Sequence, residues 1–323
     1  MTSATARGLA TITYDGTVLD VWFPAPRLTE EPLEAGTVRP EQTPQQFAAL
    51  VGPDEERGVA RVAVTTTIGS LTDVPVDAHD VYLRLHLLSH RLVRPHEVNL
   101  EGAPELLTDV VWTNYGPCTV ADFQMVRGRL SARGPVTVHS VDRFPRMVDY
   151  VVPSGVRIAD ADRVRLGAHL AEGTTVMHEG FVNYNAGTLG ATMVEGRLST
   201  GVVVGEGTDI GGGASVMSTL TGGSGAAISI GRHCLLGANS GIGISLGDDC
   251  IVEAGLYVTA GTKVTVWDEV ARSADVGNGH RIKAAELSGV GGVMYRRNSL
   301  TGAVEATPSS SRTFELNHEL RGM

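Results

Sequence analysis

Small aliphatic residues recur every six positions between about Val152 and Val264, and this period constrains the fold more than any other feature of the sequence. The first run comprises Val152, Ile158, Val164, Leu170, Val176, Val182 and, after the polar Thr188, Val194. Three further runs keep the same spacing from Leu198 to Val216, from Ile230 to Ile242 and from Leu246 to Val264. A helix repeats about every 3.6 residues and an amphipathic strand about every 2, so neither explains the pattern. Hexapeptide repeats are typical of a parallel β-helix, a solenoid of short strands.

The period changes phase three times, at Val194–Leu198, Val216–Ile230 and Ile242–Leu246. Each change requires an insertion or a skipped position, so we expect coils of unequal length. In the hexads 230–235 and 246–251 a glycine follows the aliphatic residue, and a cysteine occupies the fifth place. We expect the aliphatic side chains to fill the interior, each contributing roughly 1.5–3 kcal/mol by burial. The glycines should permit tight corners, and the cysteines should be small interior residues.

Composition agrees with a narrow coil carrying flanking modules. The chain has 323 residues, including 40 glycines, but only 5% of its residues are aromatic. Its net charge of -10 and pI near 5.5 argue against nucleic acid or an anionic membrane surface as a partner. The sequence shows neither a signal peptide nor a run of 18 apolar residues, so we expect a soluble, cytoplasmic protein.

The residues before the repeat predict a mixed α/β domain. Asp15-Gly16 between two strand-like runs indicates a β-hairpin with a type I′ turn. Further strands are predicted over 59–68, 110–113 and 136–141, and helices from Asp77 to about Val93 and from Asp122 to Arg133. The first helix should bury the face formed by Val81, Leu85, Leu88 and Leu92. His79, His86 and His90 lie on or beside it, and their spacing favours packed or solvated histidines over a metal site.

The residues after the repeat should close its open end. An uncapped β-helix exposes unpaired backbone groups. Residues 267–281 have a loop-like composition, whereas 293–300 and 303–305 predict a hairpin that can serve as a cap. The expected division is an α/β domain over 1–145, a β-helix over 146–266 and a cap with a tail over 267–323. The fold class is therefore mainly β.

Polar residues concentrate where the repeat is least regular, between Met177 and Arg197. If Val194 points inward, strand alternation directs Glu195 outward onto the side wall of the coil, with Arg197 following near a corner. On this pattern alone, a solvated Glu and Arg are the ordinary alternative to a functional pair.

Several stretches carry a specific resemblance. The segment FPRMVDYVVPSGVRIADADRVRLGAHLAEGTTVMHEGFVNYNAGTLGATMVEGR, with WFPAP, LRLHLLSHRLV, VVWTN and RRNS elsewhere, resembles the tetrahydrodipicolinate N-succinyltransferase family of the actinobacterial type. The resemblance covers nearly the whole chain. It implies a left-handed β-helix, a homotrimer, and active sites in grooves between neighbouring subunits. The implied reaction moves succinyl from succinyl-CoA to the amino group of L-2-amino-6-oxopimelate, on the succinylase route to diaminopimelate and lysine.

The resemblance also implies roles for individual residues. Glu195 matches the family's catalytic carboxylate, as a general base or as a nucleophile that forms a transient acyl anhydride. The implied contacts to the CoA ester are Arg197, Gly212, Ser215, Ala238, Glu253, Ala254 and Gly261, followed by Lys283, Arg296, Arg297, Asn298 and Ser299 toward the phosphates and nucleotide. The stretch 267–281 departs from close relatives, which affects the placement of Lys283.

Asp162 and Glu179 match positions where the family holds a structural Mg²⁺ on the trimer axis, and ordinary surface acids are the alternative. Other functions share the scaffold. An acyltransferase that uses acetyl-CoA would show the same repeat, whereas a bifunctional sugar-nucleotide enzyme would add a glycine-rich front domain. A zinc-dependent carbonic anhydrase would need clustered histidines, but His169, His178 and His233 are dispersed. A scaffold without activity is the third class.

Overall fold

The computed structural model describes residues 2–218 and 227–309. The chain forms two compact units. The first comprises the residues up to Val152 together with Arg165–Gly167, and the second comprises Pro153–Val164 and the residues from Ala168 onward. The boundary between the two units therefore falls at Val152, whereas the sequence predicted it at residue 145. The residues after 267 belong to the same unit as the coils. Positions 310–323, which include most of the expected tail, lie outside the described residues.

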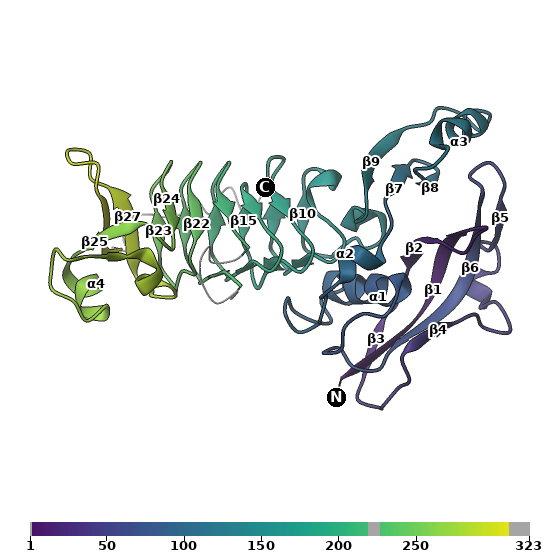
Figure 1. Cartoon of the computed structure of the whole chain (residues 1–323), viewed down its shortest axis with the longest axis horizontal. Helices are drawn as coiled ribbons and strands as arrows, with labels where there is room; N and C mark the ends of the chain where they lie inside the picture. Colours follow the sequence, from purple (N-terminus) through teal and green to yellow (C-terminus); the bar gives the residue numbers. More distant parts are fainter. Residues whose placement is uncertain (1, 219–226, 310–323) are drawn as a thin grey trace. The chain divides into compact units, whose positions relative to one another are not determined.

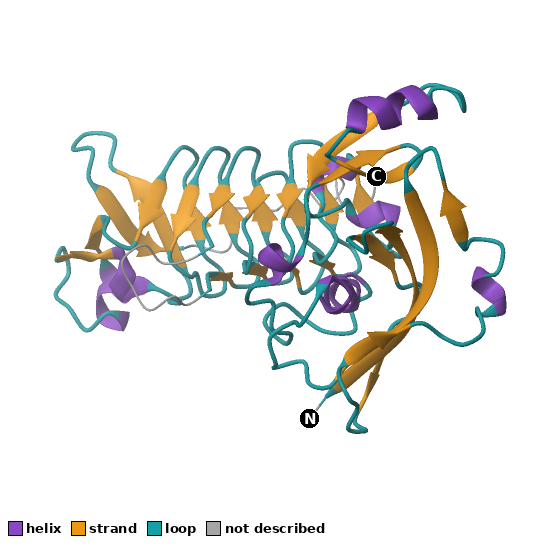
Figure 2. Ribbon diagram, turned by 45° about the vertical axis from the view of Figure 1, so that its right-hand side comes forward, coloured by secondary structure: helices purple, strands orange, loops and turns teal. Residues whose placement is uncertain are grey.

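The second unit is a parallel β-helix whose short strands stack into three ladders (Figures 1 and 2). The first ladder contains β10 (Arg157–Ile158), β12 (Thr175–Val176), β15 (Met193–Val194), β18 (Asp209–Ile210), β21 (Leu235–Leu236) and β23 (Ile251–Val252). The second contains β13 (Phe181–Val182), β16 (Arg197–Leu198), β19 (Ser215–Val216), β22 (Gly241–Gly243) and β24 (Tyr257–Thr259). The third contains β11 (His169–Leu170), β14 (Gly187–Thr188), β17 (Val203–Val204) and β20 (Ser229–Ile230).

The six-residue period is confirmed as the interior of this β-helix. Its aliphatic residues from Val164 to Val264 are buried, and Cys234 and Cys250 are fully buried beside them. Thr188 also points inward, where its hydroxyl lies 2.6 Å from that of Thr174, so the polar exception is hydrogen-bonded inside the coil. Val152 is an error of the prediction. It is 81% exposed and lies outside the coil, because the first strand of the repeat begins at Arg157.

Most corners of the coil have four residues. The backbone restricts the choice of residue at two of these positions, the first and the third. The third residue often adopts the left-handed conformation, as at His233 and Asp249. The glycine directly after the aliphatic residue was expected only to permit a tight corner, but it also lies close to the next coil. A Cβ atom on Gly237 would lie 2.5 Å from the backbone nitrogen of Ala254 in the next coil. These glycines therefore allow successive coils to approach closely, in addition to turning the chain.

The three phase changes have separate structural outcomes. At Val194–Leu198 the corner shrinks to two residues, Glu195 and Gly196, between β15 and β16. At Ile242–Leu246 the corner is again two residues shorter than usual. Leu246 forms a β-bridge with Ile230 of the preceding coil. The longer interval from Val216 to Ile230 includes residues 219–226, which lie outside the described part of the chain.

The segment after the last coil continues the first ladder. It contains β25 (Lys263–Val266), α4 (Asp268–Ser273), β26 (Arg281–Lys283), η4 (Ala284–Leu287), β27 (Val293–Arg297) and β28 (Val304–Pro308). The predicted hairpin is confirmed, since β27 and β28 pair antiparallel and β27 adds to β23. The predicted loop over 267–281 is wrong in its first part, because α4 forms there with Val270 and Ala271 buried. Two acidic residues in its first turn favour the helix through the backbone dipole.

The first unit is built on two antiparallel sheets. The larger comprises β1 (Ser3–Thr13), β2 (Val18–Trp22), β3 (Arg27–Thr29), β4 (Gly36–Val38), β5 (Gly52–Asp54) and β6 (Val59–Ile68), and the smaller comprises β7 (Val110–Thr113), β8 (Gly116–Thr119) and β9 (Val138–Asp142). The helices are α1 (Ala78–Ser89), α2 (Ala103–Leu106) and α3 (Phe123–Leu130), with short 3-10 turns η1 (Gln45–Phe47) and η2 (Met147–Asp149); η3 (Ala161–Arg163) belongs to the β-helix. The mixed α/β character is as predicted.

The hairpin at Asp15-Gly16 forms, but its turn differs from the type I′ prediction. Within this turn only Gly16 has a positive φ, at +92°. The Thr13 backbone nitrogen donates to the Thr17 carbonyl, and the Thr13 carbonyl accepts the Gly16 nitrogen. This is a three-residue loop in which glycine takes the left-handed place. The register shift between Thr11 and Ile12 accommodates the extra residue.

Helix α1 begins as predicted and ends earlier. Asp77 caps it by accepting a hydrogen bond from the Asp80 backbone. The helix ends at Ser89, and Leu92, expected on its buried face, is 39% exposed. The ten residues from Asp80 to Ser89 are all buried, so α1 is covered on every side. No helix in the described part of the chain is long and apolar enough to cross a membrane.

Candidate functional site

Glu195 occupies an unusual corner of the β-helix. Strand alternation predicted the side wall for Glu195 and a corner for Arg197, and the structure reverses this. Glu195 lies in the two-residue corner after β15, while Arg197 begins strand β16. The corner is short because the chain passes from the first ladder to the second without the usual turn. The backbone nitrogens of Glu195 and Gly196 instead both donate to the carbonyl of Ile210, at 2.8 and 3.1 Å.

The other described corners at this edge, between the first and second ladders, have four residues. They are 177–180, 211–214, 237–240 and 253–256, and together with Glu195 and Gly196 we call them the Glu195 edge. In the coil after Glu195 the corner contains Gly212, and a Cβ atom there would lie 3.5 Å from Glu195 Oε2. The Glu195 side chain therefore reaches toward a glycine of the adjacent coil, and it is half-buried.

Arg197 and Ser215 form a pair on the second ladder. They are register partners in β16 and β19, and Arg197 Nη2 donates to Ser215 Oγ at 2.8 Å. Ser215 is buried, whereas Arg197 is exposed. The described residues show no ion pair between Arg197 and Glu195, so the guanidinium remains available beside the carboxylate. The spacing of 18 residues, one full coil, is the sequence signal that could have predicted this pairing.

Four of the other candidate residues lie on the Glu195 edge. Gly212, Ala238, Glu253 and Ala254 all occupy corners between the first and second ladders. Backbone hydrogen bonds join their corners: Asn239 donates to the Gly212 carbonyl, and Gly255 donates to the Ala238 carbonyl, both at 2.8 Å. The fold thus aligns residues from four successive coils along one edge. In the sequence these residues span 59 positions, from Glu195 to Ala254.

The cap hairpin joins this edge at its last coil. Glu253 donates its backbone nitrogen to the Tyr295 carbonyl, and its carboxylate accepts the Arg297 backbone nitrogen at 2.6 Å. Arg296 and Asn298 are engaged elsewhere, because both bind the buried carboxylate of Glu305, at 3.1 and 2.9 Å. Of the two arginines, Arg297 is therefore the one whose exposed guanidinium binds only a backbone carbonyl, that of Gly302, among the described residues.

Three candidates lie in the cap away from these corners. Gly261 occupies the exposed turn between β24 and β25. Lys283 ends β26, is exposed, and donates its backbone nitrogen to Glu286 Oε1. Ser299 is exposed in the turn of the cap hairpin. These three residues lie outside the Glu195 edge.

Of the two metal candidates, only Glu179 lies on the Glu195 edge, in the corner 177–180. Asp162 lies in η3 and Glu179 in the corner after β12, and both are exposed. Glu179 lies 3.8 Å from the Arg163 guanidinium, and neighbouring His178 lies 3.6 Å from Asp160. The described residues contain no group of three His, Cys, Asp or Glu side chains arranged to hold a metal ion within one chain. Their carboxylate oxygens are the donor type that Mg²⁺ prefers, but a site would need copies of the chain.

His86 of α1 is structural. His86 is fully buried; its Nδ1 lies 2.7 Å from the Tyr82 carbonyl, and its Nε2 accepts the Phe23 backbone nitrogen. Burial lowers the pKa of His86 to about 3, so the ring stays neutral. For His86 this agrees with the prediction of a packed histidine.

Comparisons with known proteins agree with the fold. Residues 107–146 match the family described as tetrahydrodipicolinate N-succinyltransferase middle, and residues 227–260 match the hexapeptide repeat of succinyl-transferase. The chain is 46% identical to a 2,3,4,5-tetrahydropyridine-2,6-dicarboxylate N-succinyltransferase of Vibrio cholerae, over 98% of each protein. This chain belongs to the tetrahydrodipicolinate N-succinyltransferase family.

Two further relatives extend the comparison. A Pseudomonas aeruginosa protein with the same name is 50% identical over 89% of this chain and 84% of its own length. The crystal structure of a Campylobacter jejuni protein, described as a 2,3,4,5-tetrahydropyridine-2-carboxylate N-succinyltransferase, superposes with a TM-score of 0.83 at 31% identity, covering 95% of this chain and 92% of that one. The coil is thus the left-handed β-helix of this tetrahydrodipicolinate N-succinyltransferase family. The actinobacterial subtype stays a prediction.

Proposed function

We propose that this chain is a succinyltransferase that moves succinyl from succinyl-CoA to the amino group of L-2-amino-6-oxopimelate, the ring-opened form of tetrahydrodipicolinate. Family membership supports the reaction class. The observation that carries the assignment of the site is the shortened corner. Within the described part of the Glu195 edge, it alone has two residues, and it presents a half-buried carboxylate beside an exposed arginine.

The proposed chemistry requires proton removal from the acceptor. An ammonium has no free electron pair, so the amine must lose a proton before its nitrogen attacks the thioester carbon. That first proton is released to solvent. As the new C–N bond forms, Glu195 accepts a second proton from the nitrogen, and this proton passes to the CoA sulfur as the C–S bond breaks. In the covalent alternative, Glu195 attacks the thioester, CoA thiol leaves, and the amine then attacks the acyl anhydride. In the first route a carboxylate oxygen faces the N–H of the acceptor amine, and in the second it faces the acyl carbon.

The remaining candidates form the proposed donor site. Arg197, held by Ser215, binds the carboxylate of the succinyl group, because a guanidinium pairs well with a carboxylate. The CoA arm follows the Glu195 edge over Gly212, Ala238, Glu253 and Ala254 and continues to Gly261 in the turn after β24. The glycines and alanines leave the backbone accessible. Arg297 and Lys283, with Ser299, bind the phosphates and nucleotide. Arg296 and Asn298 contribute by holding the hairpin through Glu305.

We further propose that the protein acts as a homotrimer with sites between subunits, since a three-sided coil offers flat faces for three-fold packing. Asp162 and Glu179 from three copies then supply carboxylate oxygens for a structural Mg²⁺. The ion takes no part in the transfer. Light scattering should give three times the monomer mass, and chelation should weaken the trimer without changing the chemical step.

The reaction is tested by thiol release. Purified protein is mixed with freshly generated tetrahydrodipicolinate and either succinyl-CoA or acetyl-CoA, and free thiol is followed with a chromogenic disulfide. We expect acceptor-dependent release with succinyl-CoA at a rate at least tenfold above that with acetyl-CoA. Equal or faster release with acetyl-CoA would support the alternative acyl donor. Failure of both CoA esters to bind in calorimetry would instead indicate a scaffold without activity.

A further inference from the structure

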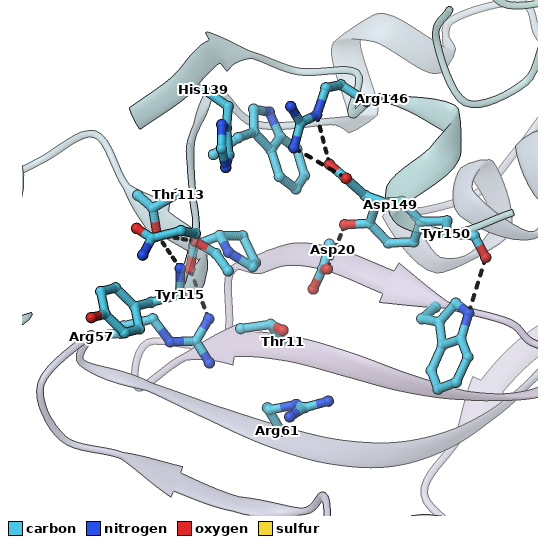
Figure 3. A pocket seen from close by; sticks show the side chains of 15 residues that line it. Thr11, Asp20, Arg57, Arg61, Thr113, Tyr115, His139, Arg146, Asp149 and Tyr150 are labelled. Carbon is cyan, nitrogen blue, oxygen red and sulfur yellow. Dashed lines mark hydrogen bonds and ion pairs between the residues drawn. The ribbon is translucent and has the colours of Figure 1, made fainter. Parts of the chain in front are cut away.

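The first unit contains a cavity of about 520 Å³ that the proposed transfer does not use. It lies between the two sheets of this unit, and Figure 3 shows side chains of β1, β2 and β6 on one side and of the smaller sheet on the other. Its volume is within the range of about 300–1,000 Å³ found for small-molecule sites. All its lining residues precede Val152, so the cavity belongs to this unit alone.

Three polar side chains lie abreast on the floor of the cavity. Thr11 of β1 is the register partner of Asp20 in β2 and of Arg61 in β6. Because paired residues of adjacent strands point to the same face of a sheet, all three side chains face the cavity. The strands β2 and β6 flank β1, so the Cα atoms of Asp20 and Arg61 are about 10 Å apart. A small molecule can therefore contact both side chains.

Asp20 is a buried carboxylate with one oxygen unsatisfied. Its residue is 8% exposed, and Oδ2 accepts a hydrogen bond from Tyr150 Oη at 2.6 Å. Oδ1 is buried without a hydrogen-bond partner in the described part of the chain. Burial raises the pKa of Asp20, while the hydroxyls of Thr11 and Tyr150 and the charge of Arg57 oppose this effect. Buried carboxylate oxygens are normally hydrogen-bonded, so Oδ1 calls for a donor.

Arg61 provides the complementary charge. The other two arginines of the cavity are engaged: Arg57 binds Asp54 at 2.7 Å, and Arg146 binds Asp149 at 2.9 Å. Arg61 is half-exposed and forms no hydrogen bond or ion pair with residues 2–218 or 227–309. An unpaired guanidinium facing a cavity is suited to a carboxylate ligand.

Aromatic rings form part of the remaining wall, which also carries polar side chains. Trp22 donates its indole N–H to the Tyr150 carbonyl, and Trp112 donates its indole N–H to the Asp142 carbonyl. With their N–H groups engaged, these two rings offer carbon surface to a ligand. Among its other polar groups, the cavity thus combines one unsatisfied carboxylate oxygen, one guanidinium without a partner in the described chain, and two indole rings.

We propose that this cavity binds a free α-amino acid with an aromatic or other apolar side chain. The ammonium of the ligand donates to Asp20 Oδ1, its carboxylate binds the Arg61 guanidinium, and its side chain packs against Trp22 and Trp112. The ligand is therefore recognised by both of its charges together, which separates this site from a simple anion site.

Tryptophan fluorescence gives a direct test on the full chain. Of the three tryptophans, two line the cavity and the third is Trp267, so a Trp267→Phe background reports the cavity. L-Phenylalanine should change this fluorescence saturably, with a matching heat in calorimetry. Removing either charge, in 2-phenylethylamine or 3-phenylpropanoate, should weaken binding about tenfold or more, because each loses a charge-assisted hydrogen bond.

Two variants assign the contacts, with a matched control. Asp20→Asn and Arg61→Gln should each weaken phenylalanine binding about tenfold or more. Arg7→Gln, which alters an exposed arginine further along β1, should leave it unchanged. If circular dichroism shows that Asp20→Asn does not fold, Arg61→Gln decides the question. The proposal is overturned if phenylalanine, leucine and methionine all fail to bind, if 3-phenylpropanoate binds as tightly as phenylalanine, or if folded Arg61→Gln binds normally.

Discussion

The coils of the β-helix and the first unit place their charged residues in opposite ways. In the β-helix the interior is formed by aliphatic residues and a few small ones, and the charged side chains of the site lie on corners and outer faces. In the first unit, by contrast, charges are buried. Arg84 and Asp80 are 1% and 3% exposed and form an ion pair at 2.6 Å inside α1. Arg57 is also buried and binds Asp54.

This difference separates residues that act on ligands from residues that hold the fold. A charge on a β-helix corner remains hydrated, so removing it costs the coil little stability and any large effect must be functional. A buried charge is retained only with its partner, because an unpaired ion in the interior is strongly unfavourable. Removing a charged side chain should therefore change mainly activity on the β-helix corners and mainly stability in the first unit.

The largest effect is expected from Glu195→Gln. The amide keeps the shape of the side chain but accepts no proton, so we expect turnover to fall about 10²- to 10⁴-fold with an unchanged unfolding midpoint. The control is Glu206→Gln, an exposed glutamate on the corner between the third and first ladders. Steady-state thiol release and urea unfolding measure both properties. Full turnover by Glu195→Gln would refute its catalytic role, and an equal loss in Glu206→Gln would show that any corner charge suffices.

The second effect is expected in the first unit, from Arg84→Met. The change leaves Asp80 charged and buried, and also removes the bonds from Arg84 to the carbonyls of Leu71 and Asn99, so we expect about 3–5 kcal/mol lower stability. Urea unfolding in the Trp267→Phe background follows this unit through Trp22 and Trp112.

The control for Arg84→Met is Arg232→Met in the β-helix. Arg232 forms an ion pair with Asp248 at 2.8 Å, but both side chains are exposed, so little or no destabilisation is expected. Similar destabilisation by the two changes would contradict the contrast between the units.

The sequence predicted the β-helix well because every coil repeats one physical requirement. An inward position must be apolar every six residues, and the interior residues from Val164 to Val264 follow this rule. The breaks in the period also help to locate the candidate site, because one of them is the corner that contains Glu195. Breaks alone are not sufficient. The second shortened corner, after Ile242, contains the fully buried Ile244 and carries none of the candidate residues.

The buried polar groups could not be predicted in the same way. Asp20, Thr11 and Arg61 meet only because three strands pair in one register, and no local pattern encodes that register. Similarly, Arg296 and Asn298 have the expected composition of a phosphate site, yet Glu305 on the facing strand binds both. Helix α4 was missed because its two buried residues are too few to produce a recognisable period.

A third prediction concerns pH and compares two paired carboxylates. Although burial opposes the shift, hydrogen bonds from Arg133 and Arg57 lower the pKa of Asp54 from 3.8 to about 2. A carboxylate whose pKa is lower in the folded state stabilises the fold above its unfolded pKa and loses that contribution as the pH falls toward its folded pKa. The stability advantage of the natural chain over Asp54→Asn should therefore decrease between about pH 4 and pH 2.

Asp248 is the matched carboxylate in the β-helix. Hydrogen bonds from Arg232 lower its pKa as well, but the pair is exposed to solvent, which screens the interaction. Asp248→Asn should therefore differ little from the natural chain at any of these pH values. Urea midpoints at half-unit pH steps measure both differences. A difference for Asp54→Asn that stays constant down to pH 2 would show that its charge does not contribute to folding.

The smallest effect on stability is expected at Gly212, and it sharpens the contrast between function and fold within a single corner. Gly212 has no positive φ, and an added methyl would lie at an ordinary contact distance of 3.5 Å from Glu195 Oε2. Gly212→Ala should therefore fold normally, with stability changed by less than about 1 kcal/mol. If the CoA ester approaches Glu195 over this residue, the methyl should raise KM several-fold.

The neighbouring Gly213 has φ +70°, and a Cβ atom there would overlap Asn239 Oδ1. Gly213→Ala should instead lose about 1–2 kcal/mol of stability, because the left-handed conformation disfavours alanine. Equal KM values for natural protein and Gly212→Ala would place the CoA ester away from this corner, while an unfolded Gly212→Ala would show that the coil, rather than the ligand, requires the glycine.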